Sequence, residues 1–288
     1  MRKHPSVSKD EAFTPEILAI GTLILRDASL WLAPQDEDFQ MAEDKSLSGK
    51  IALVTGASRG IGAAVAKSLA AKGAHVIALA RTVGGLEELD DEIQKLGGSA
   101  TLVPADLRKF DDLDRMGQAL FERFKKLDIL VGNAGQLGAL SPLPHVEQKT
   151  WQEVIDVNVT ANFRLIRSLD LLLRAADAAR AVFISSGASY KGTAYWGPYA
   201  VSKAALDMLV RTYAAEVTAT GMKVNLFNPG PIRTRMRAKA MPGEDPMTLT
   251  PPETVAEAIV ELCLPDVSEN GKLYNFPTKS WLNYAPPS

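Results

Sequence analysis

The sequence has 288 residues, 46% of them apolar, and a formal net charge of −2 at pH 7. A chain of this length can bury one large core without disulfides, and its single Cys263 excludes an intramolecular disulfide. The near-balanced charge gives no reason to expect nucleic acid or an anionic membrane surface as a partner. No uninterrupted apolar stretch reaches membrane-spanning length, and scattered histidines without a second ligand at metal spacing predict no metal site.

Residues 1–46 differ from the rest of the chain. Seven acidic and four basic residues precede Met41, unlike a basic transit peptide, and residues 17–25 lack a secretory cleavage site. Residues 15–32 could form a short amphipathic helix in a genuine appendage. Alternatively, translation starts at Met41, and the residues before it are not part of the protein. We favour this second interpretation because strand signals begin soon after Met41. We therefore expect residues 1–46 to be a poorly ordered N-terminal extension or sequence upstream of the true start. We expect the protein to be cytoplasmic.

From residue 50 onward, strand and helix signals alternate, which predicts a parallel sheet covered on both faces. Strands are expected at 50–55, 75–80, 100–104, 128–132, 181–185, 223–227 and 273–276. Helices are expected at 63–72, 85–96, 111–126, 146–174, 198–220 and 252–264. Right-handed crossovers between seven such strands predict a single-domain, doubly wound, Rossmann-like α/β fold. Its ligand should lie at the carboxyl ends of the strands.

The first strand and helix enclose the glycine-rich run Thr55-Gly56-Ala57-Ser58-Arg59-Gly60-Ile61-Gly62. A strand, turn and helix in this order direct backbone N–H groups and the positive helix end toward a phosphate. The spacing Gly-x3-Gly-x-Gly differs from the usual dinucleotide fingerprint. A glycine-rich turn without a ligand is the alternative, and the flanking strand and helix disfavour it.

Tyr199 and Lys203 lie four residues apart and therefore share one face of a helix. An ammonium group stabilises a phenolate and lowers the pKa of the phenol toward the neutral range. Taken alone, this spacing is more often two surface residues. Tyr190 and Tyr195 have no lysine four residues later, so neither can form the same pair.

Together, the glycine turn and the Tyr–Lys pair resemble the short-chain dehydrogenase/reductase family, in particular its bacterial carbonyl reductases. The resemblance covers residues 47–280 and makes 47–288 an NADP-binding domain of this type. Further matches follow in the family's order: Asp106-Leu107, Asn133-Ala134-Gly135, Asn158, Ser186 with Ser185 as its fallback, and Pro229-Gly230 with Thr234. One position departs from the pattern, since the family usually has Asn where this chain has Gly132.

The resemblance implies a role for each matched position. The implied catalytic residues are Asn158, Ser186, Tyr199 and Lys203. The implied cofactor-binding residues are Thr55, Gly56, Ser58, Arg59, Gly60, Ile61, Gly62, Arg81, Asp106, Leu107, Asn133, Ala134, Gly135, Tyr199, Lys203, Pro229, Gly230 and Thr234.

Within the catalytic set, Tyr199 exchanges a proton with the substrate oxygen, and Ser186 hydrogen-bonds that oxygen. Lys203 lowers the pKa of the tyrosine and holds the nicotinamide ribose. Asn158 positions a water that links Lys203 to solvent.

The end of the second predicted strand indicates NADP(H) as the cofactor. NAD-preferring enzymes place a carboxylate there to bind the ribose 2′-hydroxyl. This chain has Ala80 followed by Arg81, and Arg59 lies in the glycine turn. Guanidinium groups match phosphate geometry, so both arginines can bind a 2′-phosphate. Solvated surface arginines are the alternative.

The sequence thus predicts an NADP(H)-dependent oxidoreductase that interconverts a small-molecule carbonyl and a secondary alcohol. Non-redox chemistry on a bound cofactor, such as dehydration or epimerisation, is one alternative, and a regulatory or scaffold role is another. Substrate shape should depend on loops 136–148, 187–198 and 231–250. The substrate and the physiological direction do not follow from the sequence.

Side chains in two of these loops allow more than one interpretation. Trp196 and Tyr195 could stack on a substrate ring, but local packing is favoured. Four basic residues follow Pro229-Gly230, in and after the segment that the resemblance places over the nicotinamide. They are Arg233, Arg235, Arg237 and Lys239. They could attract an acidic substrate or an acyl-carrier phosphopantetheine, but the solvated side of a lid helix is favoured.

Helices 146–174 and 198–220 carry more apolar residues than one sheet-facing stripe requires. These residues are Trp151, Val154, Ile155, Val159, Phe163, Ile166, Leu169, Val201, Ala205, Leu206, Leu209, Val210 and Tyr213. The resemblance implies a homodimer or homotetramer formed through this pair of helices. Packing entirely within the subunit is the alternative.

Overall fold

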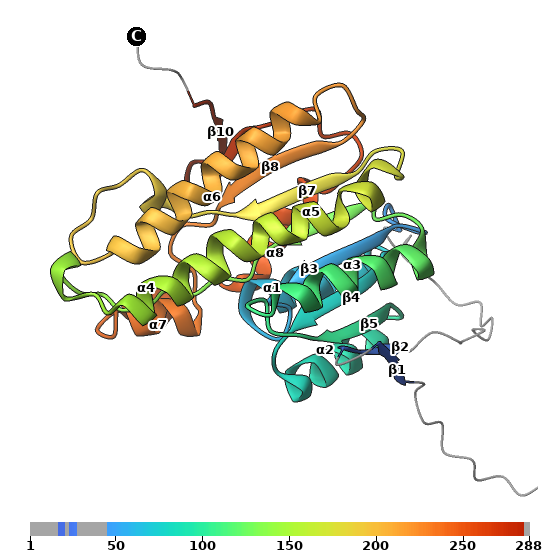
Figure 1. Cartoon of the computed structure of the whole chain (residues 1–288), viewed down its shortest axis with the longest axis horizontal. Helices are drawn as coiled ribbons and strands as arrows, with labels where there is room; N and C mark the ends of the chain where they lie inside the picture. Colours follow the sequence, from blue (N-terminus) through green and yellow to red (C-terminus); the bar gives the residue numbers. More distant parts are fainter. Residues whose placement is uncertain (1–16, 21–22, 28–44, 285–288) are drawn as a thin grey trace, which may run out of the picture.

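A single twisted sheet forms the centre of the computed structural model, which describes residues 17–20, 23–27 and 45–284 (Figure 1). Seven neighbouring strands are parallel, in the order β5-β4-β3-β6-β7-β8-β9. They are β3 (Ile51–Thr55), β4 (His75–Ala80), β5 (Ser99–Pro104), β6 (Ile129–Gly132), β7 (Arg180–Ile184), β8 (Lys223–Asn228) and β9 (Leu273–Asn275). The predicted seven-stranded, doubly wound α/β fold is confirmed.

Antiparallel strands extend this sheet at both edges, which the sequence prediction missed. On one side β10 (Ser280–Leu282) pairs with β9. On the other, β2 (Leu23–Asp27) pairs with β5, and β1 (Ile17–Ile20) pairs with β2. The helix considered for residues 15–32 is therefore wrong for its described residues. The sequence contains a reason, since two short apolar runs separated by Gly-Thr are a hairpin signal. The remainder of the prediction for 1–46 falls mainly on 1–16 and 28–44, outside the described residues.

The helices cover both faces of the sheet. One face carries α1 (Gly60–Ala71), α2 (Val83–Lys95) and α8 (Pro252–Glu261). The other carries α3 (Phe110–Phe124), α4 (Gln148–Ile155), α5 (Ala161–Arg174) and α6 (Gly197–Glu216). The short α7 (Arg235–Ala240) lies beyond the strand ends (Figure 1). No helix in the described part of the chain is long and apolar enough to cross a membrane.

The predicted helix 146–174 contains an irregular turn. Between α4 and α5, residues Asp156–Thr160 form a π-helical turn, and Asn158 lies at its middle. Such turns insert one residue into an α-helix and occur often at functional sites. Here the insertion places the fully buried Asn158 against the loop that follows β6.

An apolar core fills each side of the sheet. Cys263 belongs to the core beneath α1 and α8, and it is 2% exposed. Burial raises the pKa of its thiol to about 12. Cys263 is thus a packed core thiol.

The packing around Gly132 explains its departure from the family pattern. Gly132 ends β6, and its strand partner on β7 is Phe183, whose side chain is fully buried. A Cβ on Gly132 would overlap the Phe183 ring and would lie 2.9 Å from Oδ1 of Asn162 on α5. The space of a side chain at 132 is thus taken by the aromatic ring of the neighbouring strand.

Gly132→Ala should lower the free energy of unfolding by about 1–3 kcal/mol, because the Phe183 ring must move to admit the methyl group. Phe183→Ala alone should cost about 3–5 kcal/mol through the cavity it leaves. The double variant should lose less than the sum of the two, since the cavity accepts the methyl group. Urea unfolding followed by circular dichroism measures all three variants. Additive losses, or wild-type stability of Gly132→Ala, would contradict this explanation.

Candidate active site

The residues predicted for the site follow the carboxyl ends of the parallel strands, which share one edge of the sheet. Thr55 ends β3, and Arg81, Asp106, Asn133, Ser186 and Pro229 come soon after β4, β5, β6, β7 and β8. Contacts between these segments bring together the glycine turn, the predicted catalytic residues and the segment after β8.

The turn between β3 and α1 requires its glycines. Gly56 and Gly60 have φ angles of +67° and +58°, in the left-handed region that glycine tolerates. A Cβ on Gly62 would overlap the carbonyl oxygen of Gly56 and would lie 2.5 Å from Nδ2 of Asn133. Arg59 precedes the helix and provides no side-chain cap, and the first turn of α1 has no acidic residue. The N-terminus of α1 therefore fits a bound phosphate.

Thr55 and Asn133 support this turn from within. The buried Thr55 hydroxyl accepts hydrogen bonds of 3.0 Å from the backbone N–H groups of Asn133 and Ala134. The Asn133 amide donates to Thr55 O at 2.9 Å and to Gly56 O at 3.4 Å. These two residues, predicted to bind cofactor, thus join the ends of β3 and β6.

The remaining residues of the glycine turn and of the β6 end border the same region. Ser58 lies beside the start of α2, where a Cβ on Gly85 would be 3.1 Å from its Cβ. Ile61 packs partly buried against the core beneath α1. A Cβ on Gly135 would lie 3.7 Å from both Lys203 Nζ and Asn158 Oδ1. The backbone at Gly135 therefore passes close to the Lys203 ammonium.

Four further residues predicted to bind the cofactor differ in exposure. Arg59 and Arg81 are exposed, and within the described part of the chain neither forms an ion pair. Leu107 is 7% exposed and belongs to the core. The Asp106 carboxylate accepts hydrogen bonds from Arg108, Nη2 to Oδ2 at 2.7 Å, and this pairing lowers the pKa of Asp106. The charge of Asp106 is thus largely neutralised.

Three predicted catalytic residues meet where β7 and α6 adjoin. The Lys203 ammonium is 3% exposed and donates to the carbonyl oxygen of Ile184 at 2.7 Å. It lies 5.8 Å from the centre of the Tyr199 ring. Burial lowers the pKa of Lys203 to about 8. At neutral pH, most of this lysine is charged.

The Tyr199 phenol behaves differently from the sequence expectation. Burial raises its pKa, and its hydrogen bond with Ser186 lowers it. The Lys203 ammonium is directed to Ile184 O, and the expected lowering by lysine is not among the main effects in this structure. Tyr199 is therefore a protonated acid at neutral pH. The hydroxyl next to the phenol belongs to Ser186, while Ser185, the alternative, donates to Asp207. The catalytic role of Ser186 stays a prediction.

Asn158 joins the π-helical turn to two neighbours. Its amide donates to Gln136 O at 2.9 Å and to Ser202 Oγ at 2.8 Å, while Oδ1 accepts from the backbone N–H of Gln136 at 2.8 Å. The side chain thus fixes the loop after β6 to α6. The predicted water-positioning role stays a prediction.

The segment after β8 reaches back to the glycine turn. Gly230 has a φ angle of +72°, and its N–H donates to Asn228 Oδ1 at 3.1 Å. Thr234 caps α7 by accepting from the backbone N–H of Arg237, and a Cβ on Gly60 would lie 3.6 Å from its methyl group. Of this segment, Thr234 therefore lies beside the N-terminus of α1.

The apolar side of α7 covers Tyr199. Ala240 packs with Tyr199 and Leu137, and Met236 and Trp196 border the same cluster. Trp196 meets Tyr199 edge-on, with ring centres 6.0 Å apart, which favours local packing over substrate stacking. Tyr195 is 60% exposed.

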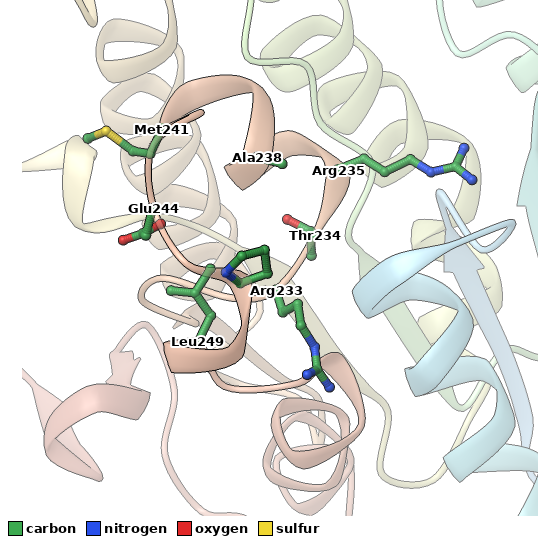
Figure 2. Close-up of a pocket in the computed structure, with 8 residues that line it drawn as sticks. Arg233, Thr234, Arg235, Ala238, Met241, Glu244 and Leu249 are labelled. Atoms are coloured by element: carbon green, nitrogen blue, oxygen red, sulfur yellow. The ribbon is translucent and has the colours of Figure 1, made fainter.

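The basic residues near α7 lie away from this apolar cluster. Arg237 forms a double ion pair with Glu244, at 2.5 and 2.6 Å, and Arg235 and Lys239 are exposed. Arg235 is among the residues that line a pocket of about 300 Å³ beside α7 and the following loop, and Figure 2 shows its guanidinium group extending away from the other lining side chains. Of the two interpretations, the arrangement supports the solvated side of a lid helix.

Sequence reasoning missed two polar residues that order the site. Asn228 Oδ1 accepts from Gly187 N at 3.0 Å as well as from Gly230, so it holds the loops after β7 and β8 together. The sequence contained one signal for Asn228, because this residue directly precedes the matched Pro229-Gly230 motif. Asp207 lies behind Lys203, and its spacing of four residues from the lysine on one helix was the signal there.

Comparisons with known proteins agree with this geometry. A family model described as short chain dehydrogenase matches residues 50–245. The uncharacterized oxidoreductase YciK of Escherichia coli strain K12 is 37% identical over 212 residues, which cover 73% of this chain and 84% of YciK. The chain therefore belongs to the short-chain dehydrogenase/reductase family.

Solved structures are similar over most of the chain. A short chain dehydrogenase from Pseudomonas syringae has a TM-score of 0.78 at 37% identity, covering 83% of this chain and 98% of its own. One from Shigella flexneri, solved as a complex with NADP, has a TM-score of 0.76 at 34% identity, with coverages of 81% and 98%.

Proposed function

We propose that this oxidoreductase interconverts a carbonyl and a secondary alcohol with NADP(H). The observation that carries the proposal is the buried Tyr199, hydrogen-bonded to Ser186 and adjacent to the Lys203 ammonium. A protonated phenol beside a serine hydroxyl gives a carbonyl oxygen one acid and one further donor. The cytoplasmic location expected from the sequence stays a prediction.

In the proposed mechanism, a bound nicotinamide supplies the hydride for reduction and accepts it in the reverse direction. Ser186 donates a hydrogen bond to the substrate oxygen and holds it beside Tyr199. Tyr199 Oη gives its proton to that oxygen as negative charge develops there. The Lys203 ammonium stabilises the resulting phenolate, which favours the transfer. The cover of α7 over this cluster limits access of water.

Two features support NADP(H) over NAD(H). Ala80, at the end of β4, leaves no carboxylate at that position to repel a 2′-phosphate. Arg81 and Arg59 present unpaired guanidinium groups near the glycine turn, while Arg108 neutralises the nearby Asp106. The related Shigella flexneri protein, solved with NADP, agrees with this preference.

The surroundings of Tyr199 favour an uncharged carbonyl compound with an apolar substituent. Leu137, Ala188, Trp196, Met236 and Ala240 pack around the phenol. Burying a charged substituent among these groups without a partner would cost several kcal/mol. We therefore propose a small neutral ketone or aldehyde, or the corresponding alcohol.

We further propose a homo-oligomer formed through α5 and α6. Six of the thirteen apolar residues expected at the interface are buried inside the subunit, including Leu206 and Val210. Outward-facing apolar side chains nevertheless occur on both helices: Phe163 and Leu171 on α5, and Val201 and Met208 on α6, between 45% and 71% exposed. A two-fold pairing of these helices would cover them.

Tyr199→Phe should lower kcat of carbonyl reduction by roughly 10²-fold or more, since it removes only the proton donor. NADPH binding, followed by fluorescence titration, should be retained because the ring remains. Tyr195→Phe, at an exposed tyrosine of the same loop region, is the matched control and should behave as wild type. Equal turnover in Tyr199→Phe and wild type would refute the acid role.

NADPH should give a higher kcat/KM than NADH in the wild-type enzyme, because the 2′-phosphate gains the two guanidinium groups. Combining Ala80→Asp with Arg81→Ala should reverse the order, since a carboxylate binds the ribose hydroxyls and repels the phosphate. Initial rates with both cofactors measure the preference. A wild-type preference for NADH of about tenfold, or 1.4 kcal/mol, would show the assignment to be wrong.

Light scattering at micromolar concentration should give at least twice the chain mass of 31.0 kDa. Leu171→Glu should reduce that mass, because it places a charge on the proposed interface. Glu216→Lys, an exposed charge change at the far end of α6, is the control. A wild-type mass near that of one chain would exclude the oligomer.

A further inference from the structure

A buried carboxylate lies directly behind the catalytic lysine. Asp207 is 4% exposed and follows Lys203 by four residues on α6, so the two side chains share one face of the helix. Lys203 donates to the carbonyl oxygen of Ile184, the last residue of β7, and Ser185 and Ser186 follow that residue immediately. Asp207 thus adjoins both the lysine and the strand end that carries the catalytic serine.

Two hydroxyl groups from distant parts of the chain hold this carboxylate. Ser185 Oγ donates to Oδ1, and the Tyr284 hydroxyl donates to Oδ2 at 2.6 Å. The Arg211 guanidinium lies 4.1 Å from the centre of the Tyr284 ring, and the ring packs against the core beneath α6. Tyr284, which follows β10, therefore closes the site of Asp207 from one side.

We propose that Asp207 is a positioning residue for the proposed reductase reaction. Its negative charge keeps the buried Lys203 protonated, and its bond to Ser185 fixes the backbone that presents Ser186. Tyr284 supports both effects by holding the carboxylate in place and excluding water. This inference rests on the proposed function for its catalytic consequence, while the effect on Lys203 can be measured without turnover.

The physical reason is the cost of burying an ammonium group. Burial alone favours the neutral amine and lowers the pKa of Lys203, and the charge of Asp207 opposes this effect. The other titratable or charged groups near this pair are Tyr199 and Arg211 on α6, Tyr284 after β10, and Tyr190. Of all these groups, Asp207 is the one whose negative charge acts on Lys203.

The same fold contains a matched control pair. On the same helix, Tyr213 donates to Asp170 of α5 at 2.7 Å, so its chemistry resembles that of Tyr284 and Asp207. Asp170 pairs with Arg174 and, within the described part of the chain, forms no hydrogen bond or ion pair with a proposed catalytic residue. Substitutions in this second pair test general effects of losing a buried tyrosine–aspartate bond.

The direct test is NMR titration of the protein labelled with ¹³C at lysine Cε, without cofactor. The Lys203 signal is assigned by its loss in Lys203→Arg, and in wild type it should titrate near pH 8. In Asp207→Asn it should titrate about one pH unit lower or more, which is the low end of the effect of a neighbouring opposite charge. Tyr284→Phe should lower the titration midpoint of Lys203 by a smaller amount. This variant provides the test if Asp207→Asn does not fold. Asp170→Asn and Tyr213→Phe should leave the midpoint unchanged.

A kinetic profile tests the consequence for the reaction. With NADPH and a ketone that the wild type reduces, kcat should fall as pH rises and Lys203 loses its proton. The midpoint of this fall should move to lower pH in Asp207→Asn and stay in place in Asp170→Asn. A Lys203 titration equal to wild type in both Asp207→Asn and Tyr284→Phe would overturn the inference. Wild type without hydride transfer to any carbonyl, but with the predicted NMR shift, would instead refute the proposed function.

Discussion

The burial of one ammonium group governs the arrangement of this site. Lys203 satisfies its charge with the carbonyl oxygen of Ile184 and with the nearby negative charge of Asp207, so α6 must lie against the end of β7. That contact fixes Tyr199 one turn earlier on α6 and Ser186 two residues after Ile184. Burying an ammonium group costs more free energy than burying an apolar side chain. A core with a purely structural role would therefore favour an apolar residue at this position. The presence of Lys203 fits the proposed role of the neighbouring Tyr199 as the acid of the reaction.

The cofactor end of the site depends on close backbone approach instead. Gly56, Gly60 and Gly62 let the β3–α1 turn fold against the ends of β6, and Thr55 and Asn133 tie the turn there. Asn228 joins the loops after β7 and β8, and Thr234 reaches the turn from the far side. The two ends meet at Gly135, whose backbone passes beside Lys203. A dinucleotide spanning these points would place its reactive ring next to Tyr199.

Much of this arrangement could be predicted because its signals are local. The apolar runs and glycine punctuation indicated seven parallel strands in a doubly wound order, and the structure contains them. The spacing of Tyr199 and Lys203 placed both on one helix face. Short edge strands such as β10 were missed because three residues carry little periodicity. The hairpin of β1 and β2 was missed because an apolar run was interpreted with the helical period.

Other features could not be predicted because they join distant residues. The Tyr284–Asp207 bond spans 77 positions, and the overlap of Phe183 with the Gly132 position arises only in the paired strands. Thr55 and Asn133 matched cofactor motifs, but their side chains bond mainly to the turn itself. The pKa of Tyr199 was expected to fall beside a lysine. In the structure, burial raises it instead, and the Lys203 ammonium bonds to Ile184 O.

The central claim is that this site transfers hydride to a carbonyl while Tyr199 supplies the proton. The most direct measurement uses NADPH carrying deuterium at the transferable position of its nicotinamide, a panel of neutral aromatic ketones, and mass spectrometry of the product. The account predicts alcohols with one deuterium on the carbinol carbon in the wild type, and roughly 10²-fold less product from Tyr199→Phe. Products without deuterium, as in dehydration or epimerisation, or equal labelling by Tyr199→Phe, would contradict it.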